Sequence, residues 1–141
     1  MASTSPKKKK AAKRGRLIVF EGLDGAGKST QLAILKKKLK KQGHDVKEVT
    51  WRSEGLIGSY IRKLQREETT LSSVAFSALH AADLADMVAN IITPALKAGK
   101  IVLCDRYLYT QIARDEALGI DPTWTEKLFS FAPEPDLVVY M

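Results

Sequence analysis

The sequence predicts an α/β protein in which a parallel sheet lies between two layers of helices. Short, wholly apolar runs alternate with longer amphipathic stretches along the chain. Strands buried on both faces are typical of parallel sheets covered by helices. The 141 residues, of which 45% are hydrophobic and 28% charged, suffice for one folded domain of ordinary size. We therefore expect a single three-layer α/β/α domain.

The first half of the chain predicts two strands and two helices. Residues 16–20 form an apolar run closed by glycines, which is typical of a buried strand. A helix is expected over residues 28–42, because its leucines recur at helical spacing and Gly43 is a good helix stop. Residues 46–50 predict the second strand. A polar, glycine-containing stretch, residues 51–58, then leads to a short helix that holds Ile61 and Leu64.

The second half predicts a long helix, a third strand, two further helices and a fourth strand. These elements are expected at residues 71–97, 101–104, 107–118, 121–133 and 137–141. Pro94 is expected to bend or restart the long helix, because proline cannot donate a backbone hydrogen bond. Asp121 before Pro122 predicts the N-cap of the last helix, which should end near Pro133.

The composition excludes several classes of protein. Cys104 is the only cysteine, which excludes a disulfide framework and a cysteine-based zinc site. The longest apolar run, residues 137–141, is far shorter than the ~20 residues of a membrane-spanning helix. The apolar core of a secretory signal is also absent. We therefore expect a cytoplasmic protein whose folded domain has no membrane partner.

The net charge of +7 comes wholly from the N-terminal end. Residues 1–16 hold seven basic residues and no acidic one, so the remainder carries 16 basic and 16 acidic residues. We expect residues 1–15 to form a basic, disordered tail and residues 16–141 to form the folded domain. The neutral domain favours no nucleic-acid partner, whereas the tail is a candidate for binding nucleic acid or anionic lipid, or a nuclear address.

Residues 22–29 match the P-loop pattern of glycine, four residues and then Gly-Lys-Ser. An apolar strand precedes this pattern and an amphipathic helix follows it, as in phosphate-binding loops. Lys28 is expected to neutralise the β- and γ-phosphates of ATP, and Ser29 to ligate Mg²⁺. The residues expected to bind the nucleotide are Gly22, Gly25, Ala26, Gly27, Lys28, Ser29 and Thr30. A plain glycine turn is the alternative, and a dinucleotide-binding turn fits less well because its third glycine is missing.

Asp105 and Arg106 come at the carboxyl end of the third apolar strand. Ligands of open parallel sheets gather at the carboxyl ends of the strands. The first and third strands are expected to be neighbours, which would place Asp105 beside Ser29 and make both candidates for binding Mg²⁺. The planar fork of Arg106 suits a second phosphate. The alternative is an ion pair between Asp105 and Arg106 at the end of the strand.

Two further groups of polar residues are candidates for a site. Arg52 follows the second strand directly, where it would bind an acceptor phosphate or remain a solvated surface residue. His80, Asp83 and Asp86 recur at helical spacing on the long helix. They are only a weak indication of a metal site, because no cysteine or second histidine lies near them in sequence. A surface-facing acidic patch or one wall of a substrate cleft is favoured instead.

Three segments resemble the thymidylate kinase family. Residues 20–30 resemble its opening motif, residues 91–107 its second signature, and residues 136–140 the strand that precedes its lid. The resemblance covers residues 16–141 with matching order and spacing. It implies a P-loop nucleoside monophosphate kinase fold with a five-stranded parallel sheet. It also implies transfer of the γ-phosphate of ATP to a deoxynucleoside monophosphate, with thymidine monophosphate (dTMP) as the expected acceptor.

The resemblance also implies roles for individual residues. Lys28, Arg106 and Asp24 would be the catalytic residues, with Asp24 facing the sugar of the acceptor and the metal. Arg52 and Arg106 would hold the acceptor phosphate. His80 stands where the family usually has a phenylalanine stacked on the base, and a histidine can still stack. The family further suggests a homodimer formed through the long helices.

The chain departs from the family pattern on the acceptor side. Leu84 stands where the family has an arginine, residues 110–111 read Thr-Gln where it has two serines, and Arg114 and Asp115 replace a tyrosine and a glutamine. The ATP side is intact, so the type of reaction is better supported than specificity for thymine. The alternatives are a phosphotransferase of the same fold with another acceptor, or a catalytically weak nucleotide-binding module.

The family comparison also predicts that segments of the kinase are missing from this chain. It ends within the fourth predicted strand, so a fifth strand and a lid are expected to be absent. Residues 24–26 of the loop hold no basic side chain, so the arginine that neutralises the transferring phosphate would have to come from the lid. We therefore expect these residues alone to be inactive.

Overall fold

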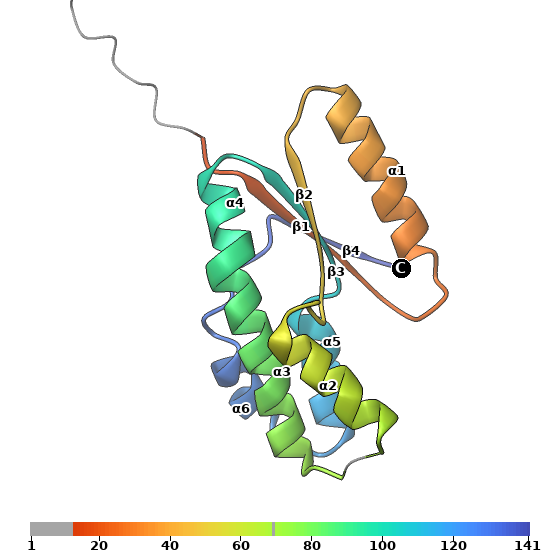
Figure 1. Ribbon diagram of the computed structural model, residues 1–141, viewed down its shortest axis with the longest axis vertical. Coiled ribbons are helices and arrows are strands. Elements are labelled where there is room, and N and C mark those ends of the chain that lie inside the picture. The colour runs from red at the N-terminus through yellow and green to blue at the C-terminus, as the bar shows by residue number, and fades with distance from the viewer. Residues whose placement is uncertain (1–12, 69) are drawn as a thin grey trace, which may run out of the picture.

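The computed structural model describes residues 13–68 and 70–141, so most of the predicted basic tail lies outside the described residues. Four parallel strands form one sheet in the order β2-β3-β1-β4, surrounded by helices (Figure 1). The elements in chain order are β1 (Arg16–Glu21), α1 (Lys28–Lys41), β2 (Val46–Thr50), α2 (Leu56–Arg66), α3 (Ser73–Met87), η1 (Val88–Ile92), α4 (Thr93–Lys97), β3 (Ile101–Asp105), α5 (Leu108–Ala117), α6 (Pro122–Leu128) and β4 (Leu137–Tyr140). All four predicted strands are confirmed.

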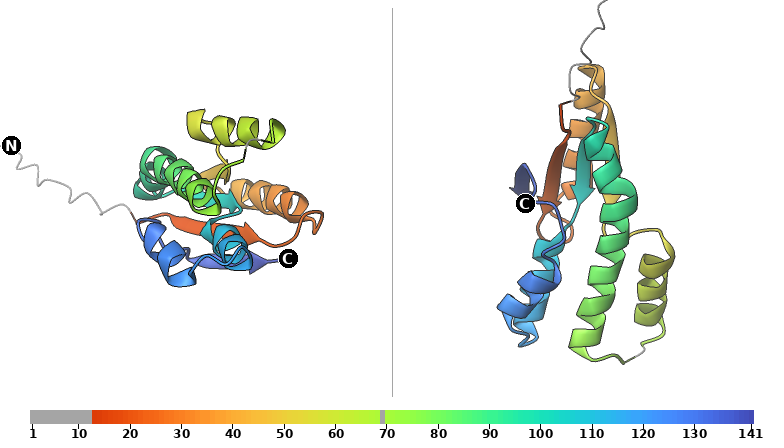
Figure 2. Two further views of the ribbon diagram at one scale, coloured as in Figure 1. Left: turned by 90° about the horizontal axis from the view of Figure 1, so that it is seen from below. Right: turned by 90° about the vertical axis from the view of Figure 1, so that its left-hand side faces the viewer.

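Each face of the sheet is covered by a separate hydrophobic cluster, as three layers require. Successive side chains of a strand point to opposite faces. Leu17 and Val19 of β1 are fully buried in a larger cluster with residues of α3 and α4. Phe20 instead packs in a smaller cluster with Leu32 of α1. Figure 2 shows α1 and the long α3–α4 helix on opposite sides of the strands, so the predicted α/β/α arrangement is confirmed.

A group of helices extends beyond the carboxyl ends of the strands. α3 packs against α2, α5 and α6, and Figure 2 shows α2 on one side of α3 and α5 and α6 on the other. Figure 1 shows these helices at the foot of the sheet, below the points where β2 and β3 end. The carboxyl ends of the strands therefore face a helical lobe, and the space between the two is where a site is expected.

The long helix widens before Pro94 where a bend or restart was predicted. α3, η1 and α4 form one continuous helix in Figure 1. Its one π turn is closed by the Thr93 N–H, which donates to the carbonyl of Val88 five residues back. A proline ring clashes with the preceding turn of a regular α-helix, and the wider turn accommodates it without breaking the helix.

The length and hydropathy of this helix, Ser73–Lys97, would suffice to cross a membrane. Its buried residues, however, include His80 and Asp83, and its apolar residues pack on the sheet. Core helices of folded domains meet the same criteria of length and hydropathy. The packing therefore identifies a core helix.

Two helix boundaries differ from the sequence prediction. α2 begins at Leu56 and includes Gly58, where a Cβ atom would lie 2.1 Å from the carbonyl oxygen of Ser53. The glycine is therefore needed for α2 to pack against the preceding loop. α6 ends at Leu128, before the expected end near Pro133, and the chain turns at the buried ring of Phe129.

Asp136 fixes the start of β4 to the start of β1. Its carboxylate accepts a hydrogen bond from the Leu17 N–H at 2.8 Å and forms ion pairs with Arg16 at 2.8 Å and Arg14 at 3.1 Å. The Leu17 N–H and then Arg16 lower the pKa of Asp136 below its ordinary value of 3.8. The ionised carboxylate is therefore the form that stabilises the folded sheet.

We expect Asp136→Asn to lower the free energy of unfolding by about 1 kcal/mol at pH 7, because a charged acceptor is lost. A lowered pKa contributes stability above the unfolded-state value, and this stability disappears as the pH falls through the folded-state pKa. The difference should therefore shrink as the pH falls below 3.8. Urea denaturation at pH 7 and pH 3 checks this. The exposed control Asp45→Asn should change stability by less than about 0.5 kcal/mol at both pH values.

Candidate functional site

Residues 22–27 form the loop between β1 and α1 at the carboxyl edge of the sheet. Gly22 has φ +131°, and a Cβ atom there would lie 1.8 Å from the carbonyl oxygen of Met141. Gly27 has φ 90° and precedes α1, whose first turn holds no acidic residue and no side-chain cap. The N–H groups at the start of α1 are therefore free to bind an anion, as the P-loop pattern predicts.

Lys28 is 6% exposed and folds back over this loop. Its Nζ donates to the carbonyl oxygen of Gly22 at 3.1 Å and to that of Leu23. The ammonium group thereby holds two carbonyls of the loop together, of which that of Leu23 also accepts from the Ala26 N–H at 3.4 Å. A bound phosphate would offer this cation a stronger, charged acceptor at the same place.

The predicted proximity of Ser29 and Asp105 is confirmed. Ser29 Oγ donates to Asp105 Oδ2 at 3.3 Å. The parallel pairing of β1 with β3 sets Phe20 against Asp105, which brings the end of β3 beside the start of α1. A hydroxyl and a carboxylate oxygen side by side fit Mg²⁺, which takes few protein ligands and completes its shell with phosphates and water.

Arg106 lies between the loop and a cavity behind it. Its backbone has φ +67°, and its N–H donates to the carbonyl of Phe20 at 2.8 Å. Its guanidinium donates to the carbonyl of Gly22 at 3.1 Å and forms an ion pair with Asp24. The ion pair considered from the sequence alone, with Asp105, does not form. The backbone turn instead directs Arg106 toward Asp24 on the glycine-rich loop.

Glu21, which is 3% exposed, is a residue of this region that the sequence alone did not predict. One carboxylate oxygen accepts from the Tyr107 N–H at 2.8 Å and from the Thr110 N–H at 3.4 Å, and the other accepts from the Thr110 hydroxyl. α5 has no side-chain cap of its own at Tyr107. Glu21 therefore caps the N-terminus of α5 from the end of β1 and fixes the helix behind Arg106.

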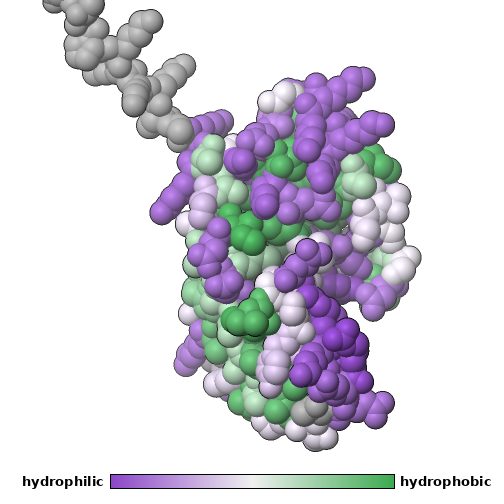
Figure 3. All heavy atoms as spheres, in the orientation of Figure 1, coloured by the Kyte–Doolittle hydropathy of each residue, from purple (hydrophilic) through white to green (hydrophobic). Residues whose placement is uncertain are grey.

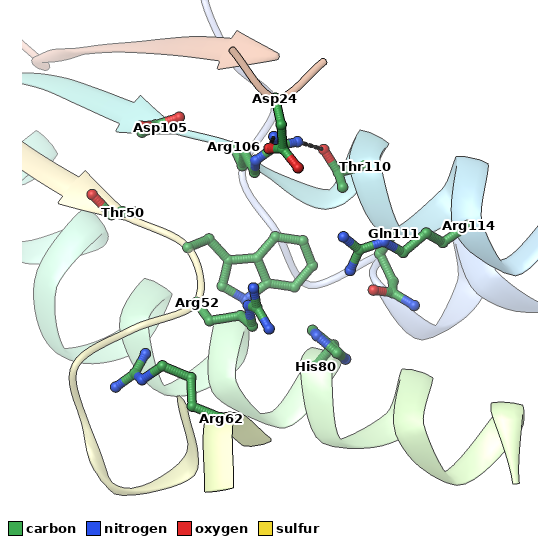
Figure 4. A pocket seen from close by; sticks show the side chains of 11 residues that line it. Asp24, Thr50, Arg52, Arg62, His80, Asp105, Arg106, Thr110, Gln111 and Arg114 are labelled. Atoms are coloured by element: carbon green, nitrogen blue, oxygen red, sulfur yellow. Dashed lines mark hydrogen bonds and ion pairs between the residues drawn. The ribbon is translucent and has the colours of Figure 1, made fainter. Parts of the chain in front are cut away.

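The cavity lies between the ends of β2 and β3 and the helical lobe (Figure 4). Figure 3 shows the molecule hollowed between the sheet and α2, with hydrophilic residues around the opening. The charged residues that line the cavity are Asp24, Arg52, Arg62, Asp105, Arg106 and Arg114. Four arginines therefore face two carboxylates, and this excess of positive charge suits an anionic ligand.

Arg52 is placed in this cavity by the loop that follows β2. Its burial, and then the positive charges of Arg114, Arg62 and Arg106, lower the pKa of Arg52 below its ordinary value. Its guanidinium donates to the side-chain oxygen of Gln65. Arg62, which the sequence analysis missed, donates to the Ser53 carbonyl at 2.7 Å. The only sequence signal for Arg62 was its position on an amphipathic helix.

The predicted surface patch of His80, Asp83 and Asp86 is wrong for His80 and Asp83, which are buried, whereas Asp86 is exposed as expected. His80 and Asp83 are each 1% exposed, and His80 lines the cavity. Asp83 Oδ2 accepts from the Ser53 N–H at 2.8 Å and so fixes the loop that carries Arg52. In the described part of the chain, no group of three or more His, Cys, Asp or Glu residues is arranged to hold a metal.

His80 presents a nitrogen without a hydrogen-bond partner. Its Nδ1 lies 2.9 Å from the Phe76 carbonyl oxygen, which can only accept, so this nitrogen carries the proton. Burial lowers the pKa of His80, and the charges of Arg52 and Arg114 lower it further. The ring is therefore neutral at pH 7, with Nε2 as a buried acceptor without a partner.

The loop, the serine–aspartate pair and the arginine-lined cavity meet at one edge of a parallel sheet. These features define a phosphate-binding α/β protein of the P-loop class. Comparison with known proteins narrows the class, because the family model described as thymidylate kinase matches residues 20–141. The chain belongs to the thymidylate kinase family.

Two relatives and one solved structure illustrate the similarity. The chain is 41% identical over 128 residues to a probable thymidylate kinase 2 of Saccharolobus solfataricus, covering 91% of this chain and 59% of that protein. It is 42% identical over 127 residues to a thymidylate kinase of Desulfotalea psychrophila, covering 90% and 63%. The crystal structure of thymidylate kinase from Ehrlichia chaffeensis superposes with a TM-score of 0.81 at 28% identity, covering 90% of this chain and 72% of the other. The chain thus spans about three fifths of the length of these two curated relatives.

We expect Glu21→Gln to lower the free energy of unfolding by about 1–2 kcal/mol, because the cap of α5 loses its charge and one acceptor oxygen. Urea denaturation monitored by circular dichroism measures the change. The control Glu116→Gln alters an exposed carboxylate on α5 and should lower the free energy of unfolding by less than about 0.5 kcal/mol. Equal effects of the two substitutions would contradict the capping role.

Proposed function

We propose that this protein transfers the γ-phosphate of ATP to a deoxynucleoside monophosphate, with dTMP as the preferred acceptor. The observation that carries the proposal is the direct contact between two anion sites. The glycine-rich loop and the arginine-lined cavity meet at the ion pair of Arg106 with Asp24. A donor phosphate on the loop and an acceptor phosphate in the cavity would therefore lie side by side, as phosphoryl transfer requires.

The donor nucleotide is assigned to the loop. The triphosphate would bind the N–H groups of Gly25, Ala26, Gly27 and Thr30 at the start of α1. Lys28 would exchange its contacts with two loop carbonyls for the β- and γ-phosphates. Ser29 and Asp105 would hold Mg²⁺, which when bound supplies charge neutralisation at the transferring phosphate.

The acceptor nucleotide is assigned to the cavity. Arg106 and Arg52 would hold its phosphate with paired N–H donors, which suit phosphate oxygens. Asp24 would face the sugar and the metal, and His80 would lie at the base. An acceptor phosphate dianion would also compensate the burial and the repulsion between arginines, which together lower the pKa of Arg52.

In this arrangement the protein forms no covalent bond to the transferred group. Its residues align the attacking oxygen with the γ-phosphate and neutralise the charge on the phosphate oxygens. The helical lobe, which supplies His80 and Arg114 to the cavity, would cover the acceptor from the side opposite the sheet and limit access of water. Lys28, Arg106 and Asp24 would be the catalytic residues, because Lys28 and Arg106 both donate to the Gly22 carbonyl and Arg106 pairs with Asp24, where the two phosphates would approach each other.

A second candidate is a phosphotransferase of the same fold with a different acceptor. It is favoured by Leu84, which is fully buried in the core where family members carry an arginine, and by Arg114 at the cavity. The Kd values for a panel of nucleoside monophosphates, measured by isothermal titration calorimetry, separate the two candidates. Binding of ATP without binding of any nucleoside monophosphate would instead support a nucleotide-binding module.

Three further expectations stay predictions. The cytoplasm is the proposed location. The homodimer through the long helices rests on the family resemblance alone. Binding of nucleic acid is proposed at most for the basic tail, of which residues 1–12 lie outside the described part of the chain.

We expect Lys28→Ala to raise the Kd for ATP with magnesium at least tenfold, roughly the loss of one charge-assisted contact. Isothermal titration calorimetry measures this constant for the purified protein. Lys37→Ala removes an exposed lysine from the same helix and should change the Kd by less than twofold. An unchanged Kd in Lys28→Ala would contradict the assignment of the loop.

Arg106→Lys is expected to weaken the binding of dTMP more than the binding of ATP. Lysine keeps the charge but loses the paired N–H donors of the guanidinium. The Kd for dTMP should rise about tenfold, and that for ATP less than threefold. Separate titrations with each nucleotide test this. A loss confined to ATP would place Arg106 on the donor side and refute the proposed role.

A further inference from the structure

The innermost wall of the cavity carries a second polar side chain whose hydrogen-bonding direction is fixed. Gln111 on α5 is 3% exposed, and its Nε2 donates to Asp115 Oδ1 at 2.7 Å. An amide carries its N–H groups on one side and its carbonyl oxygen on the other. Figure 4 shows the amide oxygen of Gln111 on the side of His80. Gln111 therefore offers the cavity an acceptor.

Asp115 is the reason for this orientation. It is fully buried, and its carboxylate accepts from the hydroxyl of Ser77 on α3, from the amide of Gln111 and from the hydroxyl of Thr125 on α6 at 3.0 Å. A carboxylate can only accept, so Gln111 must turn its N–H₂ group toward it. The reversed amide would place two oxygens together without a proton between them.

His80 also presents a hydrogen-bond acceptor to the cavity, for a different reason. The Phe76 carbonyl holds the proton on Nδ1, so Nε2 is an acceptor without a partner. The indole N–H of Trp51, also buried without a partner, and the guanidinium of Arg114 supply donors beside these two acceptors. Buried polar groups without partners are costly, so a ligand that pairs them binds with a corresponding gain.

We propose that Asp115 is a positioning residue for acceptor specificity: by orienting Gln111, it makes this wall of the cavity read a base whose ring N–H lies between two carbonyl oxygens. Thymine and uracil have this pattern, with the ring N–H for Gln111 or His80 and the carbonyl oxygens for Arg114 and Trp51. Cytosine carries a lone pair on the corresponding ring nitrogen, which would face the lone pairs of the protein. The inference rests on the proposed function, because it assumes that the acceptor nucleotide occupies the cavity.

The test compares the Kd values of dTMP and of deoxycytidine monophosphate (dCMP) by isothermal titration calorimetry. The unmodified protein should bind dTMP at least tenfold more tightly. In Asp115→Asn, the new amide can donate to Gln111 and let it turn its N–H₂ group into the cavity. The preference for dTMP should then fall to threefold or less. Thr125→Val removes another donor to Asp115 but leaves Gln111 in place, so the preference should stay within twofold of the original.

A double variant separates specificity from structural damage. Asp115→Asn combined with Gln111→Glu exchanges the donor and acceptor of the pair, so a carboxylate oxygen again faces the cavity. The preference for dTMP should return to at least tenfold. Gln111→Met removes the acceptor without altering Asp115 and should lower the preference, which keeps the test decisive if Asp115→Asn fails to fold.

The outcomes distinguish this inference from the proposed function. An unmodified protein that binds dTMP and dCMP equally would overturn the inference while leaving a nucleoside monophosphate kinase. A preference for dTMP that persists in Gln111→Met or in folded Asp115→Asn would also overturn it. An unmodified protein that binds no nucleoside monophosphate would contradict the proposed function itself.

Discussion

The parallel pairing of β1 with β3 is the constraint on which the site depends. Its register sets Phe20 against Asp105, so both strands end at the same level. The glycine-rich loop and Arg106 then leave the sheet side by side, and the carbonyl of Phe20 accepts the N–H of Arg106. Two segments more than 80 residues apart in sequence form one phosphate-binding edge, because the backbone hydrogen bonds between β1 and β3 fix where each strand ends relative to the other.

Around this edge the protein gathers positive charge that its own acids only partly balance. Arg106 is paired with Asp24, whereas Arg52 has a neutral partner, Gln65, and lies in the field of three other arginines. Such an arrangement costs stability in the free protein, and residues outside the cavity offset this by fixing its walls. Asp83 fixes the loop that carries Arg52, and Glu21 fixes the helix behind Arg106. The residues that face the cavity, Arg52 and Arg106, are therefore different from the residues that hold their segments in place, Asp83 and Glu21.

The sequence predicted the parts of this arrangement that follow from local pattern. Apolar runs located three of the four strands, and the spacing of glycines and Lys28 located the loop, because both signals lie within a few residues. It did not predict Glu21 or Asp83, since a buried carboxylate in a strand or helix is recognisable only once its donors from other elements are known. The orientation of Gln111 likewise depends on Asp115, Ser77 and Thr125 meeting across three helices. Strand pairing and burial are long-range properties that local periodicity does not contain.

The π turn at Val88–Ile92 also determines how this chain can change over evolution. It holds one residue more than an α-helical turn, and one residue corresponds to about 100° of rotation around a helix. The segment before the turn directs His80 to the cavity, whereas the segment after it directs Ala95 and Leu96 to the cluster on the sheet. Deleting a single residue there would rotate one segment relative to the other and remove either the cavity wall or the core contact. The length of this helix is therefore far less free to vary than its sequence, and insertions and deletions should accumulate in the surrounding loops.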